Sequence, residues 1–309
     1  MSFVEKALQK MQSAQPAPAG RAVVQGDFNP RTVAGHEPSP SGVSEAHLSD
    51  RARHALDALP VLNVDRGFLR EQGLLPTAAQ ERQVAGQFRN IKRSIIGAVL
   101  EAEPADPKVV PRSIMVTSAL SGDGKTFSCF NLAFSLALER DWQVLLVDAD
   151  VLKPQMTTIL KTNDRRGLLD VLADPVLSVT DAVLRTNVTG LYFLPAGQRD
   201  SAAAEMLSSQ RMSAVLKQLT GLAPNMLVLF DSPPMLLTSE ARAVMGFMQQ
   251  ILLVVKAGKT PQHAVKETVN LLAGAGTRTA VVLNGVQAEG LGVYSYGYGY
   301  GSADDRRHD

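Results

Sequence analysis

The sequence predicts an α/β protein with a mostly parallel β-sheet that is covered by helices on both faces. Segments with strand character alternate with helical segments from residue 114 to residue 284, which is typical of a parallel sheet whose connections are helices. The strand segments are near-continuous runs of Val, Leu and Ile, as expected of strands buried on both faces. In such sheets, ligands bind beyond the carboxyl ends of the strands.

Six strands and five helices are expected in this part of the chain. The strands are expected at residues 113–118, 143–148, 191–194, 226–231, 250–255 and 280–284. The helices are expected at residues 125–140, 168–173, 202–219, 239–248 and 262–272.

A further amphipathic helix is expected between residues 76 and 100, where Val84, Phe88, Ile91, Ile95 and Val99 recur at helical spacing. Its basic residues are Arg82, Arg89, Lys92 and Arg93. The simpler interpretation is a helix packed on the core with a solvated basic face, and the alternative is an oligomer contact.

The motif that organises the chain is SALSGDGKT at residues 118–126, which follows a predicted strand and leads into a predicted helix. In this context the pattern indicates a phosphate-binding loop, and the sheet is then of the P-loop NTPase type. Lys125 would reach the β- and γ-phosphates of a nucleotide, and Thr126 would place its hydroxyl on Mg²⁺. The alternative is a glycine-rich turn that caps a core helix. The residues predicted to bind nucleotide in this loop are Ser121, Gly122, Asp123, Gly124, Lys125 and Thr126.

Two apolar strands end in carboxylates close to this loop. VLLV at residues 144–147 leads to Asp148 and Asp150, and LVLF at residues 227–230 leads to Asp231. A carboxylate in this place can hold Mg²⁺, and a second one can accept a proton from an attacking hydroxyl. Capping of turns or helices is the alternative. The predicted catalytic residues are Lys125, Asp148, Asp150 and Asp231, and the predicted metal ligands are Thr126, Asp148 and Asp231.

Composition narrows the class of protein. The 309 residues allow one large α/β domain with extensions, and the formal charge of +1 gives no general reason to expect a nucleic-acid partner. The single cysteine, Cys129, forms no intrachain disulfide and fits a reducing compartment, and a packing role is expected for it. Neither a signal peptide nor a bilayer-spanning apolar run is found, so membrane association is expected only through a partner.

Both ends of the chain differ from the predicted domain, which spans residues 81–290. Residues 1–80 are expected to be an extension with a short amphipathic helix at residues 2–11 and a mostly flexible, Ala- and Pro-rich linker. Residues 291–309 are expected to be a flexible tail. Its tyrosines, which alternate with Ser or Gly, are Tyr294, Tyr296, Tyr298 and Tyr300. From the residues alone, a tail for weak association and a set of phosphoryl acceptors are equally good interpretations.

Together these motifs resemble the bacterial tyrosine kinases (BY-kinases), and most closely the exosortase-associated tyrosine autokinases of exopolysaccharide systems. Further marks of the resemblance are MSFVEKAL at the start, QFRNIKR at residues 87–93, LPAG at residues 194–197 and TPQHA at residues 260–264. The likeness covers the chain from about residue 80 to its end, together with the first dozen residues.

The resemblance implies an autokinase that uses Mg²⁺ and ATP to phosphorylate its tyrosine cluster and so regulates exopolysaccharide synthesis or export. It places Asp150 near the acceptor hydroxyl and makes Asp231 the Walker B aspartate, and Asn284 is similar to a position that contacts adenine. The implied partners are a membrane-embedded polysaccharide co-polymerase as activator, further copies of the chain in a homo-oligomer and a cognate tyrosine phosphatase, with no nucleic acid. The implied location is the cytoplasmic face of the membrane.

Two alternatives and two departures accompany this resemblance. The alternatives are a partitioning-type ATPase switch, which usually has an extra lysine at the place of Leu120, and a catalytically weak ATP-sensing scaffold. Where the family usually has an arginine two positions after its second aspartate, this chain has Leu152. Where the family's oligomerisation helix has an acid followed by two arginines, this chain has Gly86, Arg89 and Lys92.

Overall fold

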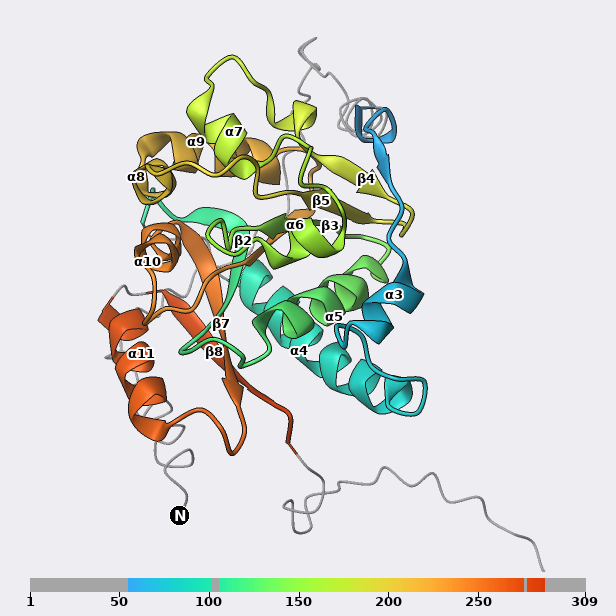
Figure 1. Cartoon of the computed structure of the whole chain (residues 1–309), viewed down its shortest axis with the longest axis vertical. Coiled ribbons are helices and arrows are strands. Elements are labelled where there is room, and N and C mark those ends of the chain that lie inside the picture. Colours follow the sequence, from blue (N-terminus) through green and yellow to red (C-terminus); the bar gives the residue numbers. More distant parts are fainter. Residues whose placement is uncertain (1–54, 102–105, 275–276, 287–309) are drawn as a thin grey trace, which may run out of the picture. The chain divides into compact units, whose positions relative to one another are not determined.

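The computed structural model of the chain describes residues 55–101, 106–274 and 277–286 (Figure 1). The strands within these residues are β1 (Val61–Leu62), β2 (Val110–Ser118), β3 (Gln143–Asp148), β4 (Leu184–Thr186), β5 (Leu191–Leu194), β6 (Met226–Asp231), β7 (Met248–Lys256) and β8 (Arg278–Asn284). The α-helices are α3 (Arg66–Glu71), α4 (Glu81–Glu101), α5 (Lys125–Ala137), α6 (Gln155–Ile159), α7 (Leu168–Ala173), α8 (Ala203–Ser208), α9 (Gln210–Thr220), α10 (Ser239–Met245) and α11 (Gln262–Gly274).

The strands form one sheet in the order β1-β4-β5-β3-β6-β2-β7-β8. The short pair β4 and β5 is antiparallel, and the other neighbours are parallel. The prediction of a mostly parallel sheet with helical connections is therefore confirmed. Strands β3, β5 and β6 and helix α7 also have the predicted bounds.

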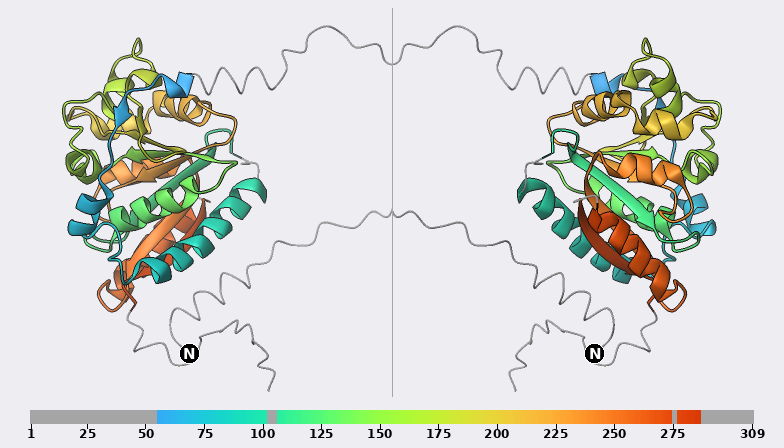
Figure 2. Two further views of the ribbon diagram at one scale, coloured as in Figure 1. Left: turned by 90° about the vertical axis from the view of Figure 1, so that its right-hand side faces the viewer. Right: turned by 90° about the vertical axis from the view of Figure 1, so that its left-hand side faces the viewer.

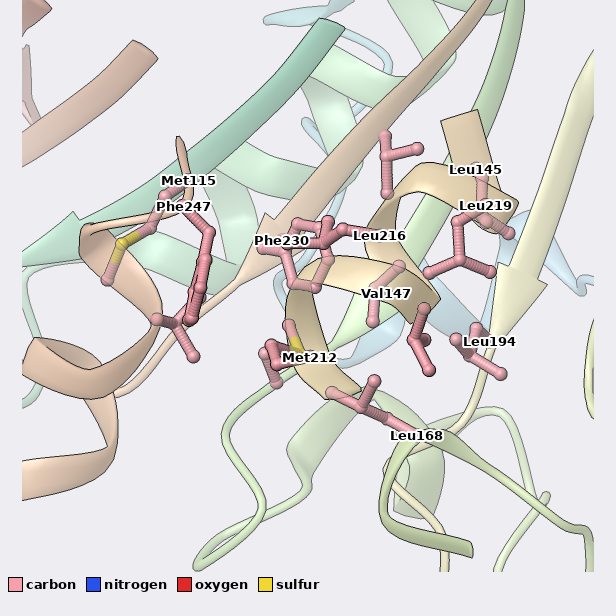
Figure 3. Packing of buried hydrophobic residues seen from close by; sticks show 14 of the residues in the cluster. Met115, Leu145, Val147, Leu168, Leu194, Met212, Leu216, Leu219, Phe230 and Phe247 are labelled. Atoms are coloured by element: carbon pink, nitrogen blue, oxygen red, sulfur yellow. The ribbon is translucent and has the colours of Figure 1, made fainter. Parts of the chain in front are cut away.

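The sheet is covered on both faces, as predicted (Figures 1 and 2). On one side, here called the α5 face, Ile114 and Val116 of β2 pack in a cluster with apolar residues of α3, α4, α5 and α6. On the other side, the α9 face, Met115 packs in a cluster with residues of helices α7 to α11. Figure 3 shows part of this second cluster, with Phe230 of β6 beside α9. Alternate residues of the central strands β2, β3, β6 and β7 thus enter opposite cores.

Cys129 of α5 lies fully buried in the cluster on the α5 face. Burial raises the pKa of its thiol, so the neutral side chain serves packing, as expected from the sequence. No helix among the described residues combines the length and the hydropathy that a membrane span needs.

The expected single helix at residues 202–219 is wrong, because the chain forms α8 and α9 with a break at Ser209. This residue has an extended backbone, with φ −74° and ψ 161°, and its hydroxyl accepts a hydrogen bond from the N–H of Met212. Serine is a favoured N-cap residue. The buried positions change phase at the break, from Ala203 and Leu207 in α8 to Met212, Val215 and Leu216 in α9, and the single-helix prediction overlooked this change.

Residues 61–80 contribute to the sheet domain, although the sequence assigns them to a mostly flexible extension. Val61 of β1 pairs with Arg185 of β4, and Val64, Leu69 and Leu74 are buried in the cluster on the α5 face. A strand of two residues is too short to show a periodic pattern, so β1 could not be recognised from the sequence. The predicted helix at residues 2–11, the linker at residues 15–48 and the boundary at residue 291 lie outside the described residues.

The basic residues of α4 divide into two kinds. Lys92 is 6% exposed, and its ammonium lies 2.5 Å from Glu139 Oε1 and 3.1 Å from the carbonyl oxygen of Ser135 in α5. Lys92 therefore links α4 to α5 and its following residues. Because its side chain is buried within the chain, it belongs neither to a solvated face nor to an oligomer contact. Arg82, Arg89 and Arg93 are exposed.

Candidate nucleotide and magnesium site

The predicted phosphate loop lies between the end of β2 and the start of α5. Gly122 has φ 88° and Gly124 has φ 94°, in the left-handed region that glycine adopts without a steric penalty. At Gly124 a Cβ atom would also collide with the amide nitrogen of Asn284. Gly124 is the N-cap of α5, and the N-terminus of a helix is a favourable anion site. The backbone therefore has the form that a phosphate cradle requires.

Side chains from two later segments hold this loop in place. Asp123 is 4% exposed, and its Oδ1 accepts a hydrogen bond of 2.7 Å from the hydroxyl of Thr260. The same hydroxyl accepts a bond of 2.9 Å from the N–H of Lys256. Asn284 donates from Nδ2 to the carbonyl oxygen of Asp123 at 2.9 Å. The ends of β7 and β8 are thus tied to the phosphate loop, and Asn284 lies directly beside it.

Two predicted carboxylates meet next to Thr126. Asp148 and Asp231 are Cα partners in the β3–β6 ladder, and each follows a residue of the α9-face core, so both side chains lie on the α5 face. Oδ2 of Asp231 accepts a hydrogen bond of 2.8 Å from the hydroxyl of Thr126. Oδ1 of Asp148 and Oδ1 of Asp231 are buried and have no hydrogen-bond partner among the described residues.

Burial makes two neighbouring negative charges unfavourable here. It raises the pKa of Asp148 to about 7, and the nearby Asp231 adds to the effect. It also raises the pKa of Asp231, to about 6, while the positive charge of Lys125 opposes that shift. A cation would relieve both carboxylates. The free oxygens beside the Thr126 hydroxyl suit Mg²⁺, which proteins hold through one or two carboxylates and the phosphates of the substrate.

Asp150 is placed differently from these two. It is half-buried beyond the end of β3, and its Oδ1 accepts a hydrogen bond of 3.2 Å from the N–H of Lys153. Burial raises the pKa of its carboxyl, and the charge of Lys125 opposes the shift. The side chain of Leu152, two residues on, is 45% exposed. Asp150 thus lies at the margin of the site.

Three residues at the site were not predicted to act there. Thr157 of α6 donates to Asp148, Oε1 of Gln155 lies 3.3 Å from the hydroxyl oxygen of Thr126, and Thr260 donates to Asp123 of the loop. Helix α6 has only five residues, too few for a periodic pattern. Two features of the sequence could have indicated these residues. They are the threonines at 157 and 158, shortly after Pro154, and the segment TPQHA at residues 260–264. The four tail tyrosines lie outside the described residues.

Comparison with known proteins identifies relatives of this chain. The family model described as an AAA domain matches residues 111–274, which is just over half of the chain. Tyrosine-protein kinase YwqD of Bacillus subtilis (strain 168) is 29% identical over 212 residues, which cover 69% of this chain and 85% of that protein. Putative tyrosine-protein kinase AmsA of Erwinia amylovora is 31% identical over 182 residues, but these cover only 23% of its length.

Solved structures show the same relationship. The kinase domain of the Escherichia coli tyrosine kinase ETK matches with a TM-score of 0.57 and 28% identity, covering 69% of this chain and 80% of that one. The BceF tyrosine kinase domain matches with a TM-score of 0.58 and 27% identity, covering 77% of this chain and 98% of that one.

Proposed function

The chain belongs to the AAA domain family, and its relatives are bacterial tyrosine kinases; on this premise we propose that it transfers the γ-phosphoryl group of ATP to tyrosines of its own C-terminal tail. The observation that carries the proposal is the meeting of Thr126, Asp231 and Asp148 beside the phosphate loop. Their free oxygens provide a place for Mg²⁺ next to the phosphates, which phosphoryl transfer requires.

Each residue of the site has a role that follows from its position relative to the phosphate loop. The backbone N–H groups from Ser121 to Gly124 bind phosphate oxygens, and the ammonium of Lys125 neutralises charge on the β- and γ-phosphates. Thr126, Asp148 and Asp231 would hold Mg²⁺, which would supply further neutralisation of the phosphates when bound. Asn284, beside the loop, contacts the adenine base.

Asp150 accepts the proton of the acceptor phenol, because it lies at the margin of the site where a tyrosine can enter. The phenolic oxygen forms a bond to the γ-phosphorus while the bond from that phosphorus to the β–γ bridging oxygen breaks. The products are phosphotyrosine and ADP, and the proton leaves through the carboxylate of Asp150.

The acceptors are Tyr294, Tyr296, Tyr298 and Tyr300. About ten residues separate Asn284 from Tyr294, and at roughly 3.3 Å each they span on the order of 30 Å. That reach permits transfer within one chain or between two chains. The resemblance to the family favours transfer between chains of a homo-oligomer, with the domain at residues 81–290 acting on the tail at residues 291–309.

The same resemblance supports a regulatory role in exopolysaccharide synthesis or export. The activator is a membrane-embedded co-polymerase that binds at the cytoplasmic face, and a cognate phosphatase reverses the modification. The exposed Leu152 beside Asp150, where an arginine is usual in the family, changes the contact with that activator.

Mass spectrometry of the purified protein after incubation with Mg²⁺ and ATP tests the activity, with Lys125→Met as the inactive control. We expect phosphotyrosine at residues 294–300 of the wild type alone. ATP hydrolysis without phosphotyrosine would support the partitioning-type switch, and nucleotide binding without either reaction would support the scaffold.

A mixing experiment tests which chain is the substrate. Lys125→Met protein with an intact tail is combined with active protein in which Tyr294, Tyr296, Tyr298 and Tyr300 are replaced by phenylalanine. Phosphotyrosine on the inactive chain supports transfer between chains. Its absence, with wild type active alone, shows transfer within a chain.

A further inference from the structure

Thr157, to which the sequence analysis assigned no role, contacts a predicted metal ligand. It is 2% exposed, and its hydroxyl and its backbone N–H both donate to Oδ2 of Asp148, at 2.8 Å and 2.7 Å. The hydroxyl oxygen also accepts a bond of 3.0 Å from the N–H of Ala196. Because an N–H can only donate, the proton of the hydroxyl is free to point at Asp148.

These bonds make the two oxygens of Asp148 unequal. Oδ2 receives two donors from one residue, whereas Oδ1 is buried and receives none from the described residues. The carboxylate therefore has a fixed rotation, with one oxygen held by the protein and the other left for a ligand. Without the hydroxyl, one of the two restraints on this rotation is lost.

Backbone hydrogen bonds hold the segment that contacts Thr157. Ala196 lies just after β5, and the N–H groups of Leu168 and Leu169 in α7 donate to the carbonyl oxygens of Pro195 and Ala196 at 2.8 Å and 2.9 Å. Figure 1 shows α6 next to β3 and β5. The segment LPAG at residues 194–197 thus connects the packed α9 face to the carboxylate through one hydroxyl.

We propose that Thr157 is a positioning residue for phosphoryl transfer, whose hydroxyl fixes the rotation of Asp148 so that the unbonded Oδ1 would be available to Mg²⁺. The proposal rests on the proposed kinase function. Residues that orient metal ligands typically contribute a factor of about 10 to 100 to metal affinity or activity. The bond from the N–H of Thr157 remains in any side-chain variant, so the hydroxyl can be tested separately.

The test compares Thr157→Val, which removes the hydroxyl and preserves the shape, with Thr157→Ser, which keeps it. Thr158→Val is the matched control, because the exposed Thr158 hydroxyl bonds to the carbonyl oxygen of Pro154 in its own turn. Titration calorimetry measures the affinity for ADP with and without Mg²⁺, and single-turnover experiments measure phosphotyrosine formation.

We expect Thr157→Val to reduce the gain in ADP affinity from Mg²⁺, and the rate, by about 10- to 100-fold. ADP affinity without Mg²⁺ should stay close to that of the wild type, and Thr157→Ser and Thr158→Val should behave like the wild type. An unchanged magnesium effect in Thr157→Val, or equal losses in the Val and Ser variants, would overturn the proposal.

Two further comparisons keep the result decisive. If thermal melting shows that Thr157→Val is unfolded, Thr157→Cys is compared with Thr157→Ser. The two variants differ in the donor that faces Asp148, because a thiol is a weaker hydrogen-bond donor than a hydroxyl. Equal effects of Mg²⁺ on ADP affinity in these two variants would then overturn the proposal. If the wild type forms no phosphotyrosine but Thr157→Val still weakens the magnesium effect on ADP, the kinase function fails while the orientation of Asp148 by Thr157 stands.

Discussion

The two faces of the central strands have different functions, although adjacent residues of the same strand lie on opposite faces. Val147 and Phe230 point into the core of the α9 face, and the very next residues, Asp148 and Asp231, point to the α5 face beside the phosphate loop. A step of one residue along a strand reverses the side-chain direction. Strand register therefore decides where the core ends and where the chemistry begins.

The faces also differ in energy. The α9 face buries apolar side chains against helices, which stabilises the fold. The end of the α5 face instead buries two carboxylates whose Oδ1 atoms lack partners, which costs stability in the ion-free protein. The site is thus stabilised when a cation and phosphates bind, whereas the opposite core is complete without them.

The largest expected effect is on the α5 face, in Lys125→Met. Loss of the charge that neutralises the transferring phosphoryl group should lower autophosphorylation by about 10²- to 10³-fold. Thermal melting of the ion-free protein should remain within a few degrees of the wild type. Undiminished phosphotyrosine would place the chemistry elsewhere in the molecule.

On the α9 face, Phe230→Ala should have the opposite profile. Phe230 is fully buried, and truncation of a buried phenylalanine costs about 3–5 kcal/mol of unfolding free energy. Denaturant unfolding measures the loss, and the phosphorylation rate of the folded fraction should change little. A rate loss as large as that of Lys125→Met, with normal stability, would contradict the separation of the two faces.

The stability of the ion-free protein should fall as the pH rises. Because burial raises the pKa of Asp148 to about 7 and that of Asp231 to about 6, the folded state holds protons that the unfolded chain releases near pH 4. The stabilisation that these bound protons give the folded state is complete below about pH 4 and is lost as the pH rises through 6 to 7. Between pH 5 and 8 the loss from Asp148 is on the order of 3 kcal/mol.

Melting curves at pH 5 and pH 8 test this, with Asp148→Asn as the matched variant. The variant should show a smaller decrease, and Mg²⁺ with ADP should restore the wild type at pH 8. Equal decreases in the wild type and the variant would remove Asp148 from the explanation.

The smallest expected effect concerns two basic residues of α4. Lys92→Met removes a buried contact with Glu139 and Ser135 and should cost about 1–3 kcal/mol of stability. Arg89→Met, at an exposed position, should leave unfolding unchanged, and light scattering shows whether it alters assembly. Equal stability in both variants would mean that Lys92 does not fasten α4 to α5.

By itself the sequence determined the parallel sheet, the phosphate loop and the strand-end carboxylates, because each depends on local information. Apolar runs, glycine turns and the residue after a strand are all visible within a dozen neighbours. It also determined the bounds of β3, β5, β6 and α7. The short elements β1, β4 and α6 were not predicted, because they are too short to show a periodic pattern.

Only the tertiary structure decided which of these residues meet. Thr126 bonds to Asp231 across 105 residues, and Asp123 to Thr260 across 137, and no local pattern specifies such pairs. The same holds for Lys92, whose basic position suggested solvent or a partner but whose contact with α5 buries it. Thr157 gains its place because β5 and α7 bring Ala196 to its hydroxyl. Packing of distant segments, rather than local preference, sets the orientation of the carboxylates on which the chemistry depends.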